Sequence, residues 1–184
     1  MSTSLHGTGD PSPWVQRWSH LISPQGSVLD LACGHGRHMR YLQALGFQCL
    51  GLDRDAAALD TAKQFGEVLH ADVENHAWPL NGLQFDAVVV TNYLWRPLWP
   101  HILQSLKPGG VLIYETFALG NETVGKPSNP HFLLNPGELL AVCKGLRVVA
   151  FEDGFLPDPA RCVQRIVATG SDRPAQDLKL ESSL

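Results

Sequence analysis

Short apolar runs alternate with amphipathic segments along most of the chain. The run at 85–90 is continuously apolar, which is typical of a strand covered on both faces. Segments such as 35–45 and 55–65 carry apolar residues at helical spacing and end at a glycine. The pattern predicts strands over 28–31, 47–52, 67–70, 85–90, 111–116, 146–152 and 162–169, and helices over 13–22, 35–45, 55–65, 97–106 and 136–144.

This alternation predicts an α/β fold of the doubly wound, Rossmann-like kind, with a seven-stranded, mostly parallel sheet. The last two strands have no helix between them, so we expect a C-terminal antiparallel hairpin. A single domain should occupy 13–170. Residues 1–12 and 171–184 are mainly small or polar and are expected to be a flexible N-terminus and a flexible tail.

Acidic residues stand at the ends of the first three predicted strands. Because ligands of open α/β sheets bind at the carboxyl ends of the strands, these positions are candidate contacts. Asp30 precedes a Gly-x-Gly turn and could pair with an ammonium group. Asp53 lies about 20 residues further on, where an acidic residue binds ribose hydroxyls. Asp55 can cap the next helix, which leaves Asp53 for a ligand. Asp72 could accept a hydrogen bond from an adenine amine.

These features favour a nucleoside without phosphates. The chain has neither a GxxxxGK[ST] loop nor an intact GxGxxG sequence, which phosphate-bearing nucleotides favour. S-adenosylmethionine has an ammonium group, a ribose diol, an adenine amine and a sulfonium cation. The three carboxylates therefore predict S-adenosylmethionine as cofactor and S-adenosylhomocysteine as product.

The motifs resemble those of class I S-adenosylmethionine-dependent methyltransferases. VLDLACGHGRH resembles their motif I, GLDRD motif II, HADVEN the acidic adenine loop and LKPGGVLIYETF the later strand-turn motif. Within the family the chain is similar to small bacterial enzymes of the tellurite-resistance type. Ala32 departs from the family, which usually has a glycine there. The resemblance implies these cofactor-binding residues: Asp30, Leu31, Ala32, Cys33, Gly34, Gly36, Arg37, His38, Asp53, Arg54, Asp72, Val73, Thr91 and Asn92.

Three residues are candidates for contact with the reacting groups. Asn92 and Tyr93 follow the fourth strand and Glu115 ends the fifth, although all three could be packing or rim residues. The Asn-Pro-Pro-Tyr tetrad of amino-methylating nucleic-acid enzymes is absent from the sequence. Residues 118–134 are irregular and follow the fifth strand, so we interpret them as a substrate lid, with a variable surface insertion as the alternative.

The net charge of the chain bears on the class of methyl acceptor. The net charge of −4 gives no general attraction to phosphate backbones, so a small-molecule acceptor is favoured over nucleic acid. An RNA or protein acceptor would be favoured if the arginines at 37, 40, 54 and 96 formed one patch, and a non-catalytic cofactor-binding subunit is a third reading.

No metal site and no membrane span are expected from the histidine spacing and hydropathy. The four cysteines lack a CxxC pair, which is typical of a cytoplasmic protein. A monomer or homodimer is expected.

Overall fold

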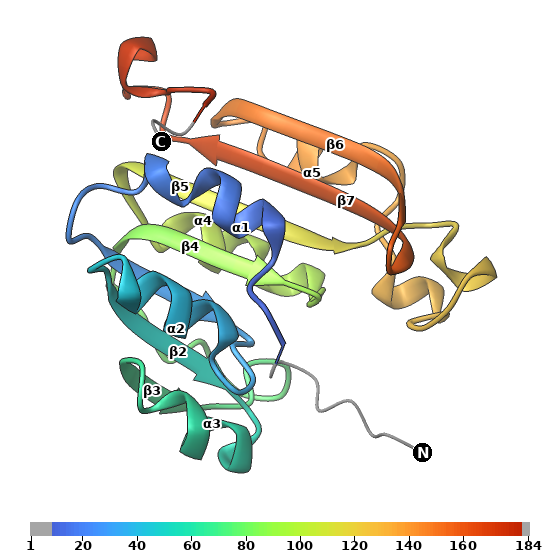
Figure 1. Ribbon diagram of the computed structural model, residues 1–184, viewed down its shortest axis with the longest axis horizontal. Coiled ribbons are helices and arrows are strands. Elements are labelled where there is room, and N and C mark those ends of the chain that lie inside the picture. Colours follow the sequence, from blue (N-terminus) through green and yellow to red (C-terminus); the bar gives the residue numbers. More distant parts are fainter. Residues whose placement is uncertain (1–8, 182–184) are drawn as a thin grey trace.

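One seven-stranded sheet forms the centre of the computed structural model, which describes residues 9–181 (Figure 1). The strand order is β3-β2-β1-β4-β5-β7-β6. The strands are Ser27–Leu31 (β1), Gln48–Asp53 (β2), Glu67–His70 (β3), Phe85–Thr91 (β4), Leu106–Phe117 (β5), Arg147–Pro157 (β6) and Ala160–Thr169 (β7). The α-helices are Pro13–Trp18 (α1), Arg37–Ala44 (α2), Ala56–Ala62 (α3), Trp99–Gln104 (α4) and Glu138–Val142 (α5).

The pairing of the strands confirms the predicted fold class. Strands β3, β2, β1, β4 and β5 are parallel to one another, whereas β7 is antiparallel to both β5 and β6. The order reverses between β1 and β4. Because the chain leaves these two strands in opposite directions across the sheet, a crevice is expected above their carboxyl ends.

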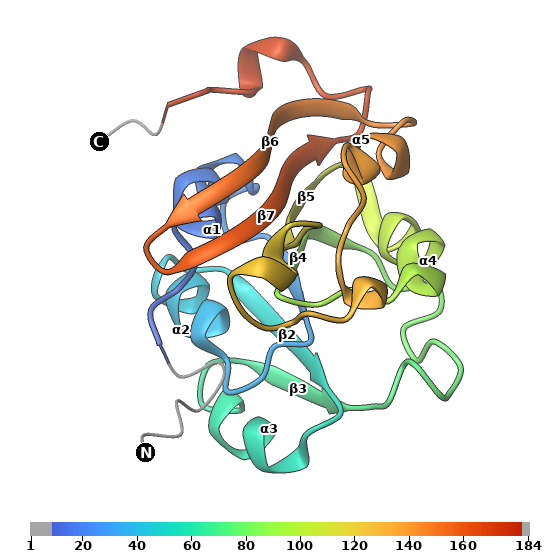
Figure 2. The same cartoon turned by 90° about the vertical axis from the view of Figure 1, so that its right-hand side faces the viewer.

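Helices cover both faces of the sheet (Figures 1 and 2). On one face α1, α2 and α3 share a hydrophobic cluster with Ala87 and Val89 of β4, and on the other α4 and α5 share a second cluster with Val88 and Val90. All four of these β4 side chains are fully buried, because successive residues of a strand point to opposite faces. This explains why the run at 85–90 is apolar without alternation.

Local backbone geometry differs from the predictions at several element ends. Helix α2 begins at Arg37 and not at residue 35, because Gly36 has a φ of +77° and the turn is still closing. The predicted helix over 97–106 is a 3₁₀ turn at Arg96–Leu98 followed by α4. Strand β5 begins at Leu106, earlier than the predicted strand over 111–116, and its register against β4 shifts between Phe85 and Ala87.

Part of each terminal segment is fixed to the domain. Ser12, expected to lie in the flexible N-terminus, is 4% exposed and caps α1 by accepting from the Trp14 amide. His20 Nε2 lies 2.9 Å from the Lys179 carbonyl oxygen. Of the segments predicted to be flexible, 1–12 and 171–184, residues 1–8 and 182–184 lie outside the described residues. Among residues 9–181 no helix is long and apolar enough to cross a bilayer.

Candidate active site

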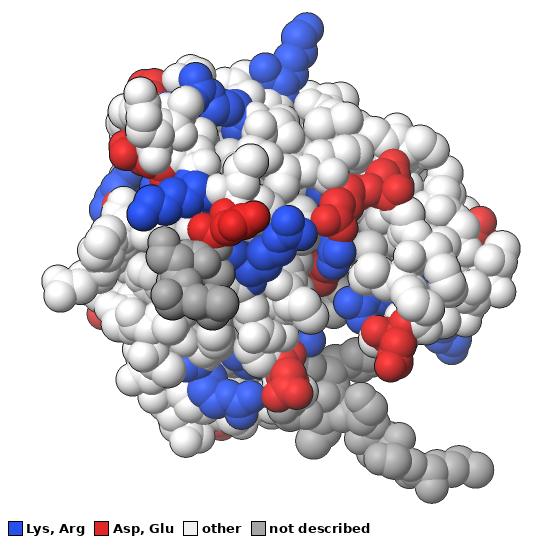
Figure 3. Space-filling view, turned by 45° about the horizontal axis from the view of Figure 1, so that its top comes forward, with Lys and Arg blue, Asp and Glu red and all other residues white. Residues whose placement is uncertain are grey.

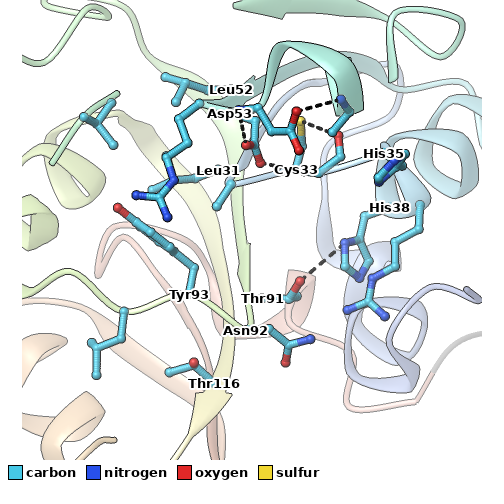
Figure 4. A pocket seen from close by; sticks show the side chains of 18 of the residues that line it. Leu31, Cys33, His35, His38, Leu52, Asp53, Thr91, Asn92, Tyr93 and Thr116 are labelled. Carbon is cyan, nitrogen blue, oxygen red and sulfur yellow. Dashed lines mark hydrogen bonds between the residues drawn. The ribbon is translucent and has the colours of Figure 1, made fainter. Parts of the chain in front are cut away.

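A pocket of about 770 Å³ opens at the carboxyl ends of β1, β2 and β4 and beside the residues that follow β3 (Figure 4). Its volume falls in the range of about 300–1,000 Å³ that is usual for small-molecule sites. The lining comprises Gly9, Leu31, Ala32, Cys33, Gly34, His35, Arg37, His38, Leu52, Asp53, Arg54, Asp55, Ala58, Ala71, Asp72, Val73, Glu74, Thr91, Asn92, Tyr93, Leu94, Thr116, Phe117, Lys126, Pro127 and Phe132. The pocket therefore brings together most of the residues that the sequence predicts.

The loop after β1 turns sharply to form one wall. Ala32, Gly34 and Gly36 all have positive φ, at +57°, +53° and +77°. A Cβ atom on Gly36 would lie 3.0 Å from the backbone of Ala62, so α2 and α3 approach closely only because this residue is glycine. Alanine at position 32 adopts the left-handed conformation that a glycine would adopt without strain. The loop thus turns sharply even with alanine at position 32.

Asp53 fixes this loop to the end of β2. Its Oδ2 accepts a 2.7 Å hydrogen bond from the Gly34 amide, and its Oδ1 accepts one of 2.9 Å from the Asp55 amide. Asp55 caps α3 as the sequence predicts. Asp53 is therefore not free, in contrast to the expectation, although each carboxylate oxygen can accept a second hydrogen bond. Figure 4 shows its side chain beside Cys33 at the pocket wall.

Asp72 organises the turn after β3. Its carboxylate accepts from the Asn75 side chain at 2.8 Å and from the Glu74 amide at 3.1 Å. The hydrogen bond from the Asn75 side chain lowers the pKa of Asp72, so this group is ionised at neutral pH. Arg54 Nη1 lies 3.7 Å from Glu74, and Val73 is buried beside them. The acidic turn at this end of the pocket is thus held by local contacts.

Asp30 is buried beneath the pocket and is not part of its lining. The side chain is 1% exposed, and Oδ2 has no hydrogen-bond partner among residues 9–181. Burial raises the pKa of Asp30 to about 7. His38 Nδ1 lies 3.9 Å away, which is too long for a hydrogen bond. A buried carboxylate oxygen without a partner at this position can bind an ammonium group. S-adenosylmethionine carries an ammonium group, so Asp30 fits this cofactor.

His38 links this region to the N-terminal segment. Its Nε2 accepts a hydrogen bond from the Ser12 amide at 3.2 Å, and its Nδ1 lies 3.5 Å from Thr91 Oγ1. Burial lowers the pKa of His38 to about 3, so the ring is neutral at pH 7 and its 3.9 Å approach to Asp30 is not an ion pair. Because Nε2 accepts, the ring proton lies on Nδ1, directed toward Thr91 and Asp30.

The three residues proposed for contact with the reacting groups occupy different environments. Asn92 has a φ of +54° and is exposed in the pocket. Tyr93 also lines the pocket, and its hydroxyl oxygen is buried without a hydrogen-bond partner among the described residues. Glu115 is 2% exposed and lies outside the lining, because Oε1 accepts from Ser12 Oγ and Oε2 lies 3.3 Å from Arg165. The pocket thus gathers Asn92 and Tyr93 but not Glu115.

The loop over 118–134 supplies lining residues that the sequence reasoning did not single out. Lys126, Pro127 and Phe132 line the pocket from this loop, and Thr116 and Phe117 do so from β5. The sequence predicted a lid over this segment but gave no signal for which of its side chains would line the pocket.

Groups of three or more His, Cys, Asp or Glu residues arranged to hold a metal ion do not occur among residues 9–181.

Comparison of the sequence with known proteins finds one family model and relatives of one name. Residues 28–110 match a family model described as a methyltransferase domain. A tRNA U34 carboxymethyltransferase from Vibrio parahaemolyticus is 29% identical over 180 residues, covering 84% of this chain and 56% of the relative. A protein of the same name from Vibrio vulnificus is 31% identical over 140 residues, covering 65% and 43%. The chain thus spans about half the length of the curated relatives it matches.

Solved structures agree with the family at the level of the fold. TehB from Haemophilus influenzae superposes with a TM-score of 0.71 at 20% identity, covering 92% of this chain and 64% of that one. A TehB-like S-adenosylmethionine-dependent methyltransferase from Corynebacterium glutamicum gives 0.64 at 22% identity, with 89% and 90% covered. The family match, the strand order and the motif residues around the pocket agree with the resemblance found in the sequence. The chain therefore matches a methyltransferase domain over residues 28–110 and has the fold of the class I S-adenosylmethionine-dependent methyltransferases, which its motifs resemble.

Proposed function

We propose that this chain transfers a methyl group from S-adenosylmethionine to a small-molecule acceptor and releases S-adenosylhomocysteine. The observation that carries the proposal is the buried, unpartnered Oδ2 of Asp30 below a pocket whose other end is lined by Asp53 and Asp72. An ammonium group, a ribose diol and an adenine amine would satisfy these three carboxylates in turn. The family match to residues 28–110 supports the same cofactor.

The residues of the chain bind and orient, and none has to take part covalently. When bound, S-adenosylmethionine supplies a methyl group on a sulfonium leaving group, so the chemistry is the cofactor's own. Asp30 would hold the ammonium group, Asp53 the ribose, and Asp72 with Val73 the adenine. Asn92 and Tyr93, at the end of β4, would position the acceptor and exclude water from it. Glu115 instead holds Ser12 and Arg165 and would act on the reaction through the N-terminal segment.

A small acceptor fits the charge distribution better than a polynucleotide does. On the face drawn in Figure 3, Lys and Arg side chains are interspersed with Asp and Glu. Two of the four arginines that would favour RNA have acidic partners: Arg96 is bonded to Glu138 and to the carbonyl oxygens of His131 and Leu133, and Arg54 is paired with Glu74. All four cysteines are free thiols, which fits the proposed cytoplasmic location.

Transfer to RNA is the second candidate. It is favoured by one observation, the similarity to proteins named tRNA U34 carboxymethyltransferase. Since the chain spans about half of those proteins, the similarity concerns the shared domain and not the whole relatives.

Calorimetric titration and a turnover assay test both candidates. We expect the protein to bind S-adenosylmethionine and S-adenosylhomocysteine and to bind NAD and ATP poorly. Labelled cofactor should then methylate one of a panel of thiols, phenols and carboxylic acids, and not bulk tRNA. Methylation of tRNA alone would replace the first candidate by the second. Tight binding of NAD without binding of the methyl donor would refute both.

A further inference from the structure

One end of the pocket is formed by the end of β5 and by the loop that follows it. Phe132 lines the pocket from this loop, and Phe117 lines it from β5. In the sheet order, β4 separates β5 from β1, β2 and β3. The carboxylates assigned to the cofactor lie at the ends of these three strands, so Phe132 belongs to the opposite, acceptor end of the pocket.

Phe132 is a large apolar side chain that stays in contact with water. It is 45% exposed, whereas the next two residues, Leu133 and Leu134, are 1% and 0% exposed. A ring left in water forgoes the favourable free energy that its burial would supply. A single exposed apolar side chain is common on proteins and indicates nothing by itself. The hydrogen bonds that hold the backbone of Phe132 are what distinguish it.

Arg96, in the short turn after β4, holds the backbone on both sides of Phe132. Its Nη1 donates to the His131 carbonyl oxygen and its Nη2 donates to the Leu133 carbonyl oxygen, both at 2.9 Å. Its Nε and Nη2 also donate to the two carboxylate oxygens of Glu138, at 2.7 and 2.9 Å. Nearly all the N–H donors of this guanidinium therefore serve to fix 131–133 and the start of α5.

Glu138 completes this arrangement at the start of α5. Its Oε2 accepts hydrogen bonds from the Asn135 amide at 2.7 Å and from Asn135 Nδ2 at 3.1 Å. Burial alone would raise the pKa of Glu138, but the hydrogen bonds from Arg96 and Asn135 outweigh it and lower that pKa, so the carboxylate is ionised at neutral pH. A bidentate pair of opposite charges fixes direction as well as distance. Arg96 is thus itself held in one orientation.

The turn that carries Phe132 is also closed from within. The Phe132 amide donates to the Asn129 carbonyl oxygen at 2.9 Å, and Asn129 Oδ1 accepts from the His131 amide at 3.0 Å. The backbone at Phe132 is therefore fixed from both directions, while its ring remains half exposed at the pocket. A ring presented on a fixed backbone loses little conformational freedom when a ligand packs on it.

We propose that Phe132 is a specificity-determining residue that contacts an apolar part of the methyl acceptor, and that Arg96 is the positioning residue that holds it there. Contact with the acceptor removes the exposed ring from water. Leu94 and Phe117 line the same end of the pocket, so the acceptor is an organic molecule with an apolar body. This proposal rests on the proposed function, because it takes this end of the pocket as the site of the acceptor.

Binding of two neutral probes to the protein saturated with S-adenosylhomocysteine tests the proposal. Benzamide carries a phenyl ring, and acetamide carries the same amide without the ring, so the difference between them isolates the apolar contact. Both are titrated by nuclear magnetic resonance, and bulk tRNA is titrated as the alternative acceptor. The affinity for S-adenosylhomocysteine is measured separately for each protein by calorimetry.

The variants separate the ring from the side chain that positions it. Phe132→Ala removes the ring, and Arg96→Lys keeps the positive charge but lacks the planar fork of donors. The matched controls are Phe155→Ala and Arg147→Lys, since both residues are exposed and neither lines the pocket. With 4-fluorophenylalanine in place of the seven phenylalanines, the fluorine signal that is missing from Phe132→Ala is that of Phe132.

We expect the parent protein to bind benzamide at least about tenfold more tightly than acetamide. Phe132→Ala should weaken benzamide binding about three- to tenfold and leave acetamide binding unchanged, because only the contact with the ring is lost. Arg96→Lys should weaken benzamide binding at least about twofold and shift or broaden the fluorine signal of Phe132 but not that of Phe155. Both controls should bind the probes as the parent does, and all variants should bind S-adenosylhomocysteine within about twofold of the parent.

Several outcomes would contradict this inference. If S-adenosylhomocysteine binds but the parent does not prefer benzamide, or Phe132→Ala binds benzamide unchanged, the contact with the acceptor is wrong and the proposed function stands. An unchanged Phe132 signal in Arg96→Lys overturns the role of Arg96. Saturable binding of tRNA without binding of benzamide overturns the small apolar acceptor, and failure to bind S-adenosylhomocysteine overturns the proposed function together with this inference.

Discussion

Replacing Asp30 by asparagine should change both the stability of the free protein and its affinity for the cofactor, in opposite directions. The carboxyl is 1% exposed, its Oδ2 has no partner within 9–181, and burial raises its pKa from 3.8 to about 7. One pKa unit corresponds to about 1.4 kcal/mol, so the full penalty for ionising Asp30 in the fold is about 4 kcal/mol at high pH. Asparagine has a similar shape and no charge.

The sign of the pH dependence follows from the raised pKa. The folded state holds the Asp30 proton up to about pH 7, whereas the unfolded chain releases it near pH 3.8. Stability of the cofactor-free protein should therefore fall between pH 5 and pH 8, by roughly 2–3 kcal/mol from this group. Asp30→Asn should lose this component, while Asp60→Asn, which removes an exposed carboxylate on α3, should keep it. Urea unfolding at several pH values measures the difference between the variants.

Cofactor binding should show the reverse trend, because the ammonium group needs the ionised carboxylate. We expect the affinity of the parent protein for S-adenosylhomocysteine to rise at least about tenfold from pH 5 to pH 8, and that of Asp30→Asn to stay low and nearly flat. Calorimetric titration over the same pH range measures this. Parallel stability profiles for the parent and Asp30→Asn, or equal affinities at pH 8, would refute the assignment of Asp30 as the ammonium partner.

The other predictions concern the loop after β1, the ribose contact and the lid. Asp53→Ala removes acceptors for the Gly34 amide and for a ribose, so calorimetry should show a loss of about 1–3 kcal/mol in cofactor affinity. Because Asp53 also holds the loop, thermal unfolding should show a destabilisation of about 1–2 kcal/mol, which a residue that contacts only the ligand would not cause. Ala32→Gly relieves a positive φ and should raise the free energy of unfolding by up to about 1 kcal/mol; a destabilised variant would argue against strain at this position. A length-matched Gly-Ser replacement of 122–130, which keeps the buried Asn121, should leave cofactor affinity within about threefold and lower turnover at least about tenfold. Lost cofactor binding with turnover retained at saturation would mean that this loop is not a lid for the acceptor.

Local patterns in the sequence were sufficient to predict the order and type of the strands. The continuous apolar run at 85–90 indicated a strand buried on both faces, because only such a strand has no polar side. The absence of a helix between the last two strands predicted their antiparallel pairing. The acidic residues at 53 and 72 could be placed at the pocket because the carboxyl ends of parallel strands meet at one edge of the sheet.

Tertiary structure decided which polar groups remain available for a ligand. Glu115 and Asp30 both lie near the carboxyl ends of strands at the predicted edge. Glu115 is paired with Arg165 and accepts a hydrogen bond from Ser12, whereas Asp30 Oδ2 has no partner within 9–181. Arg165 lies 50 residues from Glu115, and the antiparallel register of β5 and β7 alone places them opposite each other. The charge of a single residue is visible in a sequence, but whether that charge is compensated depends on contacts between distant segments. For the same reason the place of Lys126 and Pro127 in the pocket lining, beside Asn121, which bonds to Pro127 and to Cys162 of β7, could be found only in the folded chain.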